Sequence, residues 1–203
     1  GNAAGKKTLA LVTDMDQPLG SAVGNALEVA EAIATLRGDF GGELLELCLE
    51  LGACILMGAG RCDDREDGKA LLRETIADGS ALAKLREFIA AQGGDPRVTE
   101  DPGLLPQAPV QMDVPAPGDG YVHAIVADRV GRVCTHLGGG RATKEDEIDL
   151  SVGVLLQKKV GDPVRAGESL AVIHAADEAA AREAVRQLAA CYQIGAEPVP
   201  VPA

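Results

Sequence analysis

The chain has 203 residues, of which 25% are charged and 46% are hydrophobic, and its formal net charge is -12. This size suits one large or two small domains, and the composition is typical of a soluble globular protein. The acidic excess argues against a surface for nucleic acid or anionic membrane, because both need clustered Lys and Arg. A small phosphate remains a possible ligand, since backbone N–H groups bind it whatever the net charge.

The number of cysteines, the low aromatic content and the short apolar stretches argue against several further classes of protein. The five cysteines are odd in number and form no close pairs, so neither a disulfide framework nor a zinc site is predicted. We expect buried thiols in a reducing cytoplasm. Only 2% of the residues are aromatic, which removes the stacking platforms that RNA binders use. Neither a signal peptide nor a membrane-spanning stretch is recognised, so a cytoplasmic location is expected.

The first predicted element is a strand. Residues 8–12, Thr-Leu-Ala-Leu-Val, form an apolar run that suits a buried parallel strand. In an open α/β sheet, the loop that leaves such a strand lies at the ligand edge. Residues 13–20 combine acids and turn formers directly after this run. We interpret them as a loop that builds a site.

A series of helices that would cover a sheet is expected next. The first should span residues 26–37, because Asn25 and Glu28 resemble a capping box and Gly38 offers a left-handed stop. Residues that cap helix starts and glycines that end helices predict three more helices. These are residues 43–58, a helix marked by Asp63 and Glu66 that ends near Gly79, and a helix from Ser80 that stops before Gly93-Gly94.

Prolines then divide the chain. Residues 95–117 lose the helical pattern and contain six prolines, which indicates an extended, stiff linker. The predicted domains are therefore residues 1–94 and 118–203, joined by 95–117. In the second domain we expect strands at 121–126, 152–156 and 170–173, a helix over 177–191, and a short last strand that includes Val199 and Val201.

Several strings together resemble the pyrimidine-nucleoside phosphorylase and thymidine phosphorylase family. They follow the family order over almost the whole chain, as TDMDQPLG with GNALEVAEAI, then AQGGD, APGDGYV, LGGGRATKED and KKVGDPV. The order makes the match specific, although no single glycine string would be. Family members carry a small helical domain and a Gly-rich phosphate loop upstream. The chain therefore resembles the C-terminal portion of such an enzyme.

The resemblance implies both the fold class and the reaction. The fold would be the second half of an α/β domain, followed by an α+β domain of the barrel-sandwich type found in lipoyl and biotinyl carriers. The intact enzyme would cleave uridine or thymidine with phosphate as co-substrate, giving the free base and a pentose 1-phosphate, and would be a homodimer. The family's substrate-binding motifs have no match here, so no catalytic residue is carried over. We expect this chain to be inactive without the N-terminal part of the same protein.

The resemblance also implies a monovalent-cation site, usually for potassium, in the opening loop. It maps onto the main-chain carbonyls of Leu19 and Ala22 and the carboxylate of Glu31, and the other ligands would come from the upstream phosphate loop. Oxygen ligands suit a hard cation. Glu31 would lie about 13 Å from Ala22 in a straight helix, so the chain should turn at Gly24 and the helix should begin at Asn25. The alternative is that Glu31 is only a solvated helix residue.

Two other groups of residues allow more than one interpretation. Asp14 and Asp16 would be catalytic carboxylates, magnesium ligands or acids that cap turns, and we favour turn capping. The run Gly138-Gly139-Gly140-Arg141 would be an anion-binding nest, or a tight turn with Arg141 paired to an acid such as Asp146 or Asp149. We favour the turn.

A carrier function is the remaining possibility. Residues 160–173 are similar to the hairpin of biotinyl and lipoyl carriers, which present a modifiable lysine after such a strand. Here residues 176–179 are Ala-Asp-Glu-Ala, with an acid where the lysine is needed. The leading hypothesis is therefore a portion of a pyrimidine-nucleoside phosphorylase. The alternatives are an accessory half that completes its site on a partner chain and a non-catalytic binding module.

Overall fold

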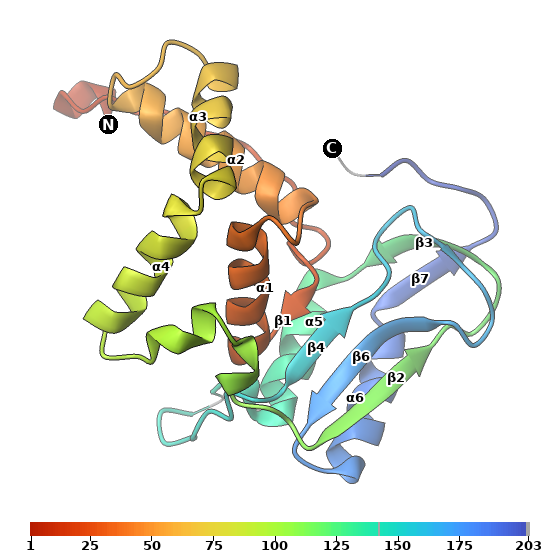
Figure 1. The fold of residues 1–203 in the computed structure, drawn as a ribbon. Helices are drawn as coiled ribbons and strands as arrows, with labels where there is room; N and C mark the ends of the chain where they lie inside the picture. Colours follow the sequence, from red (N-terminus) through yellow and green to blue (C-terminus); the bar gives the residue numbers. More distant parts are fainter. Residues whose placement is uncertain (142, 202–203) are drawn as a thin grey trace. The chain divides into compact units, whose positions relative to one another are not determined.

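The computed structural model describes residues 1–141 and 143–201, which form two compact units (Figure 1). The first comprises Gly1–Thr13 and Ala32–Pro102, and the second comprises Asp14–Glu31 and the residues from Gly103 onward. This division differs from the predicted one into 1–94, 95–117 and 118–203. Residues 14–31 fold with the C-terminal strands, because they contribute a strand to the larger sheet of that unit.

Helices dominate the first unit, and their bounds agree closely with the prediction. They are α1 (Asn25–Arg37), whose N-terminal part lies in the second unit, α2 (Glu43–Gly58), α3 (Arg65–Ala77) and α4 (Ser80–Ala91). Gly38 ends α1 with a φ of 81°, which confirms the left-handed stop. The cap of α3 is Asp64, whose carboxylate accepts from Asp67 N at 2.9 Å, one residue later than the predicted Asp63. Short 3-10 turns occupy Asn2–Ala4, Pro96–Thr99 and Pro102–Leu104.

The predicted parallel strand at residues 8–12 is wrong. This segment has no regular structure, and the side chains of Leu9 and Val12 are 51% and 100% exposed. Every strand pair among the described residues is antiparallel. A parallel strand is stabilised by neighbours on both sides and by layers on both faces, and none of the strands in the described part of the chain pairs with residues 8–12.

The second unit contains two antiparallel sheets. The larger has the order β1-β4-β6-β2, and the smaller has the order β5-β3-β7. The strands are β1 (Ala22–Val23), β2 (Val110–Pro115), β3 (Gly120–Ile125), β4 (Gly153–Leu156), β5 (Pro163–Val164), β6 (Ser169–Ala175) and β7 (Tyr192–Gly195). The described chain is thus a mixed α and β protein with antiparallel sheets.

The predicted linker and the predicted last strand both need correction. The predicted linker contains β2, which pairs with β6 from Val110 to Pro115 and places Pro115 at an irregular end of the strand, where a missing N–H is tolerated. The last strand is Tyr192–Gly195 and does not include Val199 or Val201. The prolines that flank Val199 lack the N–H donors that a strand needs.

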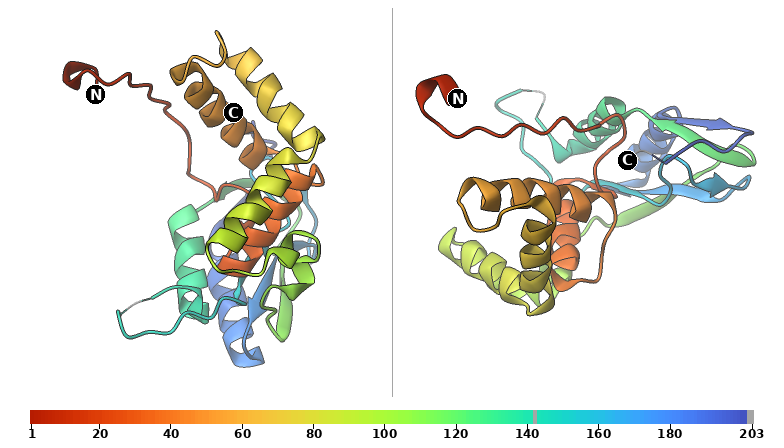
Figure 2. Two further views of the ribbon diagram at one scale, coloured as in Figure 1. Left: turned by 60° about the vertical axis from the view of Figure 1, so that its left-hand side comes forward. Right: turned by 90° about the horizontal axis from the view of Figure 1, so that it is seen from above.

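Helices α5 (Ala127–Cys134) and α6 (Glu178–Ala189) cover one face of the larger sheet (Figure 2). A π-helical turn, Thr135–Gly139, follows α5. The sequence predicted α6 but missed the short helix α5. The side chains of Leu170 and Ile173 on β6 and of Leu188 on α6 are fully buried in the hydrophobic core of this unit.

The five cysteines are free thiols. Cys134 and Cys191 are buried, whereas Cys48 is exposed, so the expectation of buried thiols holds for only part of the set. Burial raises the pKa of Cys134 and Cys191, which keeps both thiols protonated and unreactive.

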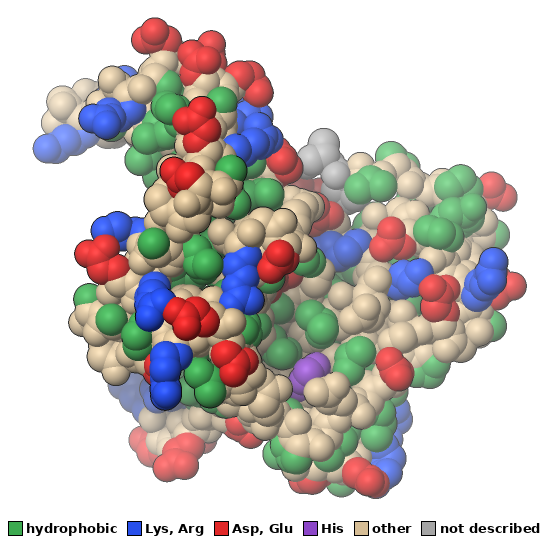
Figure 3. Space-filling model, viewed as in Figure 1, with side chains coloured by type: hydrophobic (Ala, Val, Ile, Leu, Met, Phe, Trp, Pro, Cys, Tyr) green, Lys and Arg blue, Asp and Glu red, His purple; other side chains and the backbone are tan. Residues whose placement is uncertain are grey.

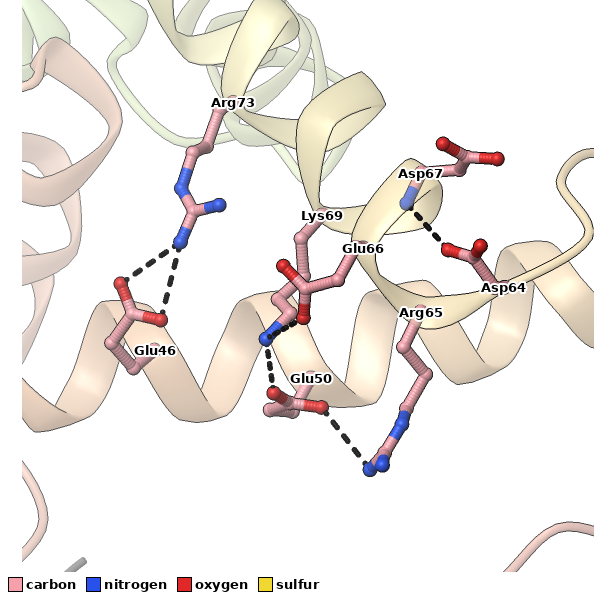
Figure 4. A network of polar contacts seen from close by, with 8 residues as sticks. All are labelled: Glu46, Glu50, Asp64, Arg65, Glu66, Asp67, Lys69 and Arg73. Atoms are coloured by element: carbon pink, nitrogen blue, oxygen red, sulfur yellow. Dashed lines mark hydrogen bonds and ion pairs between the residues drawn. The ribbon is translucent and has the colours of Figure 1, made fainter.

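Ion pairs connect α2 and α3 in a network drawn in Figure 4. Lys69, which is 9% exposed, binds one carboxylate oxygen of Glu50 and lies 2.9 Å from Glu66. The other oxygen of Glu50 is buried and lies 3.6 Å from Arg65, which is an ion pair but too long for a hydrogen bond. The hydrogen bond from Lys69 lowers the pKa of Glu50 below its ordinary value of 4.5.

This network predicts a pH dependence of stability. A carboxyl group whose pKa is lowered by folding stabilises the fold above its unfolded pKa, and this contribution is lost as the pH falls through the folded pKa. We expect the first unit to lose stability as the pH falls below 4.5, and Glu50→Gln to remove part of that loss. Urea unfolding between about pH 6 and about pH 3 measures it. Glu46→Gln is the control, because its exposed ion pair with Arg73 contributes little. Parallel pH profiles for wild type and Glu50→Gln would contradict the prediction.

A candidate cation-binding loop

The loop before α1 is held against the larger sheet. In β1, Ala22 lies opposite Leu155 and Val23 lies opposite Val154 of β4. The Leu156 N–H donates to the Ser21 carbonyl at 2.7 Å. Pro18, Gly20 and Ala22 are buried, and Leu19 and Ser21 are half-buried. A loop that is buried and hydrogen-bonded in this way presents its remaining carbonyl oxygens in fixed directions.

Glu31 reaches back from the second turn of α1 to this loop. Its Oε1 accepts from Ser21 N at 2.6 Å and its Oε2 accepts from Ala22 N at 3.3 Å. The helix begins at Asn25 and the chain bends at Gly24, which confirms the predicted reversal. Glu31 also passes close to Gly20, where a Cβ atom would lie 2.5 Å from Oε2. The interpretation of Glu31 as a solvated side chain is therefore wrong, although its role as a cation ligand stays a prediction.

The cap of α1 differs from the predicted capping box. Gly24 is the N-cap, because its carbonyl accepts the first helical hydrogen bond from Glu28 N at 2.8 Å. The Glu28 carboxylate reaches back to the Gly24 N–H at 3.0 Å, as the acid of a capping box does. The side chain of Asn25 instead donates to the carbonyl of Gly139 at 2.9 Å. The prediction was correct for Glu28 as the acid of the cap but wrong for Asn25 as the N-cap. The Asn25 side chain bonds to Gly139, a residue distant in the sequence, which the local pattern could not indicate.

The oxygen atoms around this loop suit a monovalent cation. Ser21 uses its carbonyl in the ladder with β4, so the N–H and C=O of Ala22, the next residue, point away from β4. The Ala22 N–H accordingly meets Glu31, and the Ala22 carbonyl lies on the same side of the strand. Carboxylate and carbonyl oxygens are the ligands that a hard cation prefers. The described residues contain no group of three or more acidic, His or Cys side chains placed to bind a metal. A cation here would rely on carbonyl oxygens and Glu31.

Two further residues, Lys159 and Val160, contact this loop, and the sequence did not suggest either contact. The Lys159 ammonium donates to the carbonyl of Pro18 and, at 2.8 Å, to that of Gly20. The side-chain oxygen of Gln17 accepts from Val160 N at 3.0 Å. Lys159 is part of the string KKVGDPV, but nothing in its spacing indicated a partner 139 positions away.

The two other candidate groups take structural roles. The Asp14 carboxylate accepts from Asp16 N at 2.8 Å, which is the turn capping that we favoured. Gly138 has a φ of 101°, and its carbonyl accepts from Asp149 N at 2.9 Å, which joins the two ends of the loop that follows the glycine run. Asp149 accepts from the N–H and hydroxyl of Ser151, and Asp146 accepts from those of Thr143. These bonds support a turn over an anion-binding nest, whereas the expected pairing of Arg141 with Asp146 or Asp149 stays a prediction.

Comparisons with known proteins give the chain its relatives. Residues 1–82 match the family model of the "Glycosyl transferase family, a/b domain". Residues 121–195 match the family model of the "Pyrimidine nucleoside phosphorylase C-terminal domain". The pyrimidine-nucleoside phosphorylase of Geobacillus stearothermophilus is 48% identical over 202 residues, which cover 100% of this chain and 46% of that protein. The Bacillus subtilis enzyme is 50% identical over 175 residues, which cover 86% of this chain and 40% of that protein. The chain thus spans about half the length of these relatives or less.

A membrane-spanning helix must be long and apolar, and a charged patch needs side chains of one sign close together. Among residues 1–141 and 143–201, none of the helices combines the length and the apolar character that a bilayer crossing requires. On the face drawn in Figure 3, acidic side chains are interspersed with Lys and Arg.

Proposed function

The chain belongs to the pyrimidine-nucleoside phosphorylase family, and from this premise we propose that it forms the portion of such an enzyme that carries the cation loop and the C-terminal domain. The observation that carries this proposal is the identity of 48% to the Geobacillus stearothermophilus enzyme along the whole chain. The intact enzyme would cleave uridine or thymidine with phosphate, giving the free base and a pentose 1-phosphate. This portion alone would be inactive.

Leu19, Ala22 and Glu31 are the proposed cation ligands of this portion. The contacts of Glu31 with the N–H groups of Ser21 and Ala22 support the proposal, because they place a carboxylate on the loop that offers the two carbonyls. A bound potassium ion would supply fixed positive charge next to this loop. The residues of the chain would orient the loop, since Glu31 holds it from the helix side and β4 holds it from the sheet side. Positioning and electrostatic stabilisation are the main sources of catalysis in such a transfer.

The C-terminal sheets are proposed to be a barrel-sandwich of the lipoyl type without carrier function. Two antiparallel sheets of four and three strands are compatible with that architecture. After β6, the carboxylate of Asp177 accepts from Ala180 N at 2.8 Å and caps α6. The position at which a carrier would present a lysine therefore has a structural role here. A cytoplasmic location and a homodimeric intact enzyme stay predictions.

A chimaera tests the proposed function. The segment of the Geobacillus stearothermophilus enzyme that this chain matches would be replaced by this chain, and release of uracil or thymine from uridine or thymidine would be followed with phosphate present. We expect no release by the chain alone and turnover by the chimaera. Glu31→Gln in the chimaera should raise the potassium concentration needed for half-maximal activity, whereas Glu28→Gln, which changes only the helix cap, should not.

Three outcomes would contradict the proposal in different ways. Turnover by the chain alone would disprove its dependence on another portion. A folded chimaera without turnover would disprove the phosphorylase assignment. Recovery of activity only after mixing this chain with a separately produced remainder of the enzyme would favour the accessory-half hypothesis.

A further inference from the structure

Lys159 is held in a rigid turn between β4 and β5. Its N–H donates to the Asp162 carboxylate at 2.7 Å, and the Asp162 N–H donates back to the Lys159 carbonyl at 3.1 Å. Gly161 adopts a φ of 96° and donates its N–H to the Val122 carbonyl at 2.8 Å, which ties the turn to β3. The backbone of Lys159 is therefore held in place by contacts that do not involve its own side chain.

The side chain of Lys159 enters the loop that precedes α1. Its ammonium donates to the carbonyls of Pro18 and Gly20, and both of these residues are buried. The neighbouring Val160 N–H donates to Gln17, which is 8% exposed. The turn thus binds the first half of the loop, just as β4 and Glu31 bind its second half. All of these residues belong to the second unit.

Charge explains why a lysine suits this place. Two carbonyl oxygens of one short loop converge on a single positive group, which is the arrangement that also binds a hard cation. Leu19, whose carbonyl is a proposed potassium ligand, lies between the two residues that Lys159 binds. The Glu31 carboxylate also lies close to Gly20, where a Cβ atom would be 2.5 Å from Oε2. An ammonium group and a carboxylate are therefore both close to Gly20.

We propose that Lys159 is the internal cation of this loop: its ammonium binds the carbonyls of Pro18 and Gly20 and so fixes the loop conformation without a dissolved ion. Lys159 is a positioning residue, since its ammonium binds two carbonyls of the loop. The inference rests on the proposed function only in that the same loop is expected to bind potassium. Its test needs neither substrate nor turnover.

Chemical rescue tests this role in the chain itself. Lys159→Met keeps most of the aliphatic stem and removes the charge. In tetramethylammonium chloride, a salt whose cation is too bulky and has no N–H donors, we expect the Ser21 and Ala22 amides of this variant to exchange hydrogen about 10-fold faster than in wild type. Ammonium or potassium chloride at the same ionic strength should restore protection, because a small cation can occupy the vacated carbonyls.

Lys158→Met is the matched control. The adjacent ammonium of Lys158 pairs with Glu168 at 2.6 Å and donates to the Pro163 carbonyl at 3.2 Å, so it does not bind the loop. This variant should keep Ser21 and Ala22 protected in tetramethylammonium chloride. Lys159→Arg, which keeps the charge and the donors, should protect them more than Lys159→Met does. Lys159→Gln, which also removes the charge, serves as the test variant if Lys159→Met fails to fold.

Two results would overturn the inference. One is wild-type protection of Ser21 and Ala22 in Lys159→Met, or in a Lys159→Gln variant, without any small cation. The other is faster exchange that neither ammonium nor potassium reverses, because the aliphatic stem and not the charge would then be responsible. An inactive chimaera combined with successful rescue would reject the proposed function and leave the role of Lys159 standing.

Discussion

Replacing Gly153 by Ala is expected to lower the free energy of unfolding by about 3 kcal/mol, at the upper end of the usual cost of overpacking. Gly153 opens β4 next to Val154, which lies opposite the last residue of β1, and the two backbones approach closely. A Cβ atom there would lie 2.4 Å from the Val23 carbonyl oxygen and 3.0 Å from Gly24 Cα. These are backbone atoms, so relief requires β1 to move away from β4. The loop that holds the proposed cation ligands would then lose its attachment to the sheet.

Urea unfolding of the second unit measures this effect, and Gly118→Ala is the matched control. A Cβ at Gly118 would meet no atom within 4 Å, so its substitution should change stability by less than about 0.5 kcal/mol. Faster amide exchange at Ala22 in Gly153→Ala would show that the damage includes β1. A Gly153→Ala variant as stable as Gly118→Ala would contradict the close approach of the two strands.

Leu170→Ala should destabilise the second unit by about 3 kcal/mol, within the range of about 2 to 5 kcal/mol seen for buried leucines. Leu170 is fully buried on β6, the strand that pairs with both β2 and β4. The truncation removes apolar contacts and leaves a cavity that strands held on both sides cannot close. The loss should therefore affect the whole unit and not one edge of the sheet.

Leu150→Ala provides the comparison for that experiment. This leucine is 49% exposed in the same unit, so its truncation should cost less than about 1 kcal/mol. Chemical unfolding followed by circular dichroism gives both values from the same transition. Equal effects of the two substitutions would mean that β6 is not central to the core.

Local features of the site were predictable because they depend on residues close in the sequence. The start of α1 at Asn25 and the reversal of Glu31 follow from a bend at Gly24 and from helical spacing. The bounds of α2 and the left-handed stop at Gly38 follow from periodicity and capping. Strings spread over the chain also identified its family, since their order does not depend on how the segments pack.

The pairing of distant segments was decided only by the tertiary structure. Residues 8–12 look like a strand by composition, but a strand needs a neighbour, and none of the described strands pairs with them. Residues 110–115, which lie within the proline-rich segment 95–117, do form a strand, because β6 supplies its hydrogen bonds. Lys159 meets Pro18 and Gly20 across most of the chain. Helices and caps form from bonds between residues a few positions apart, whereas strand partners and the lysine in this loop are fixed by backbone groups that only the folded sheet brings together.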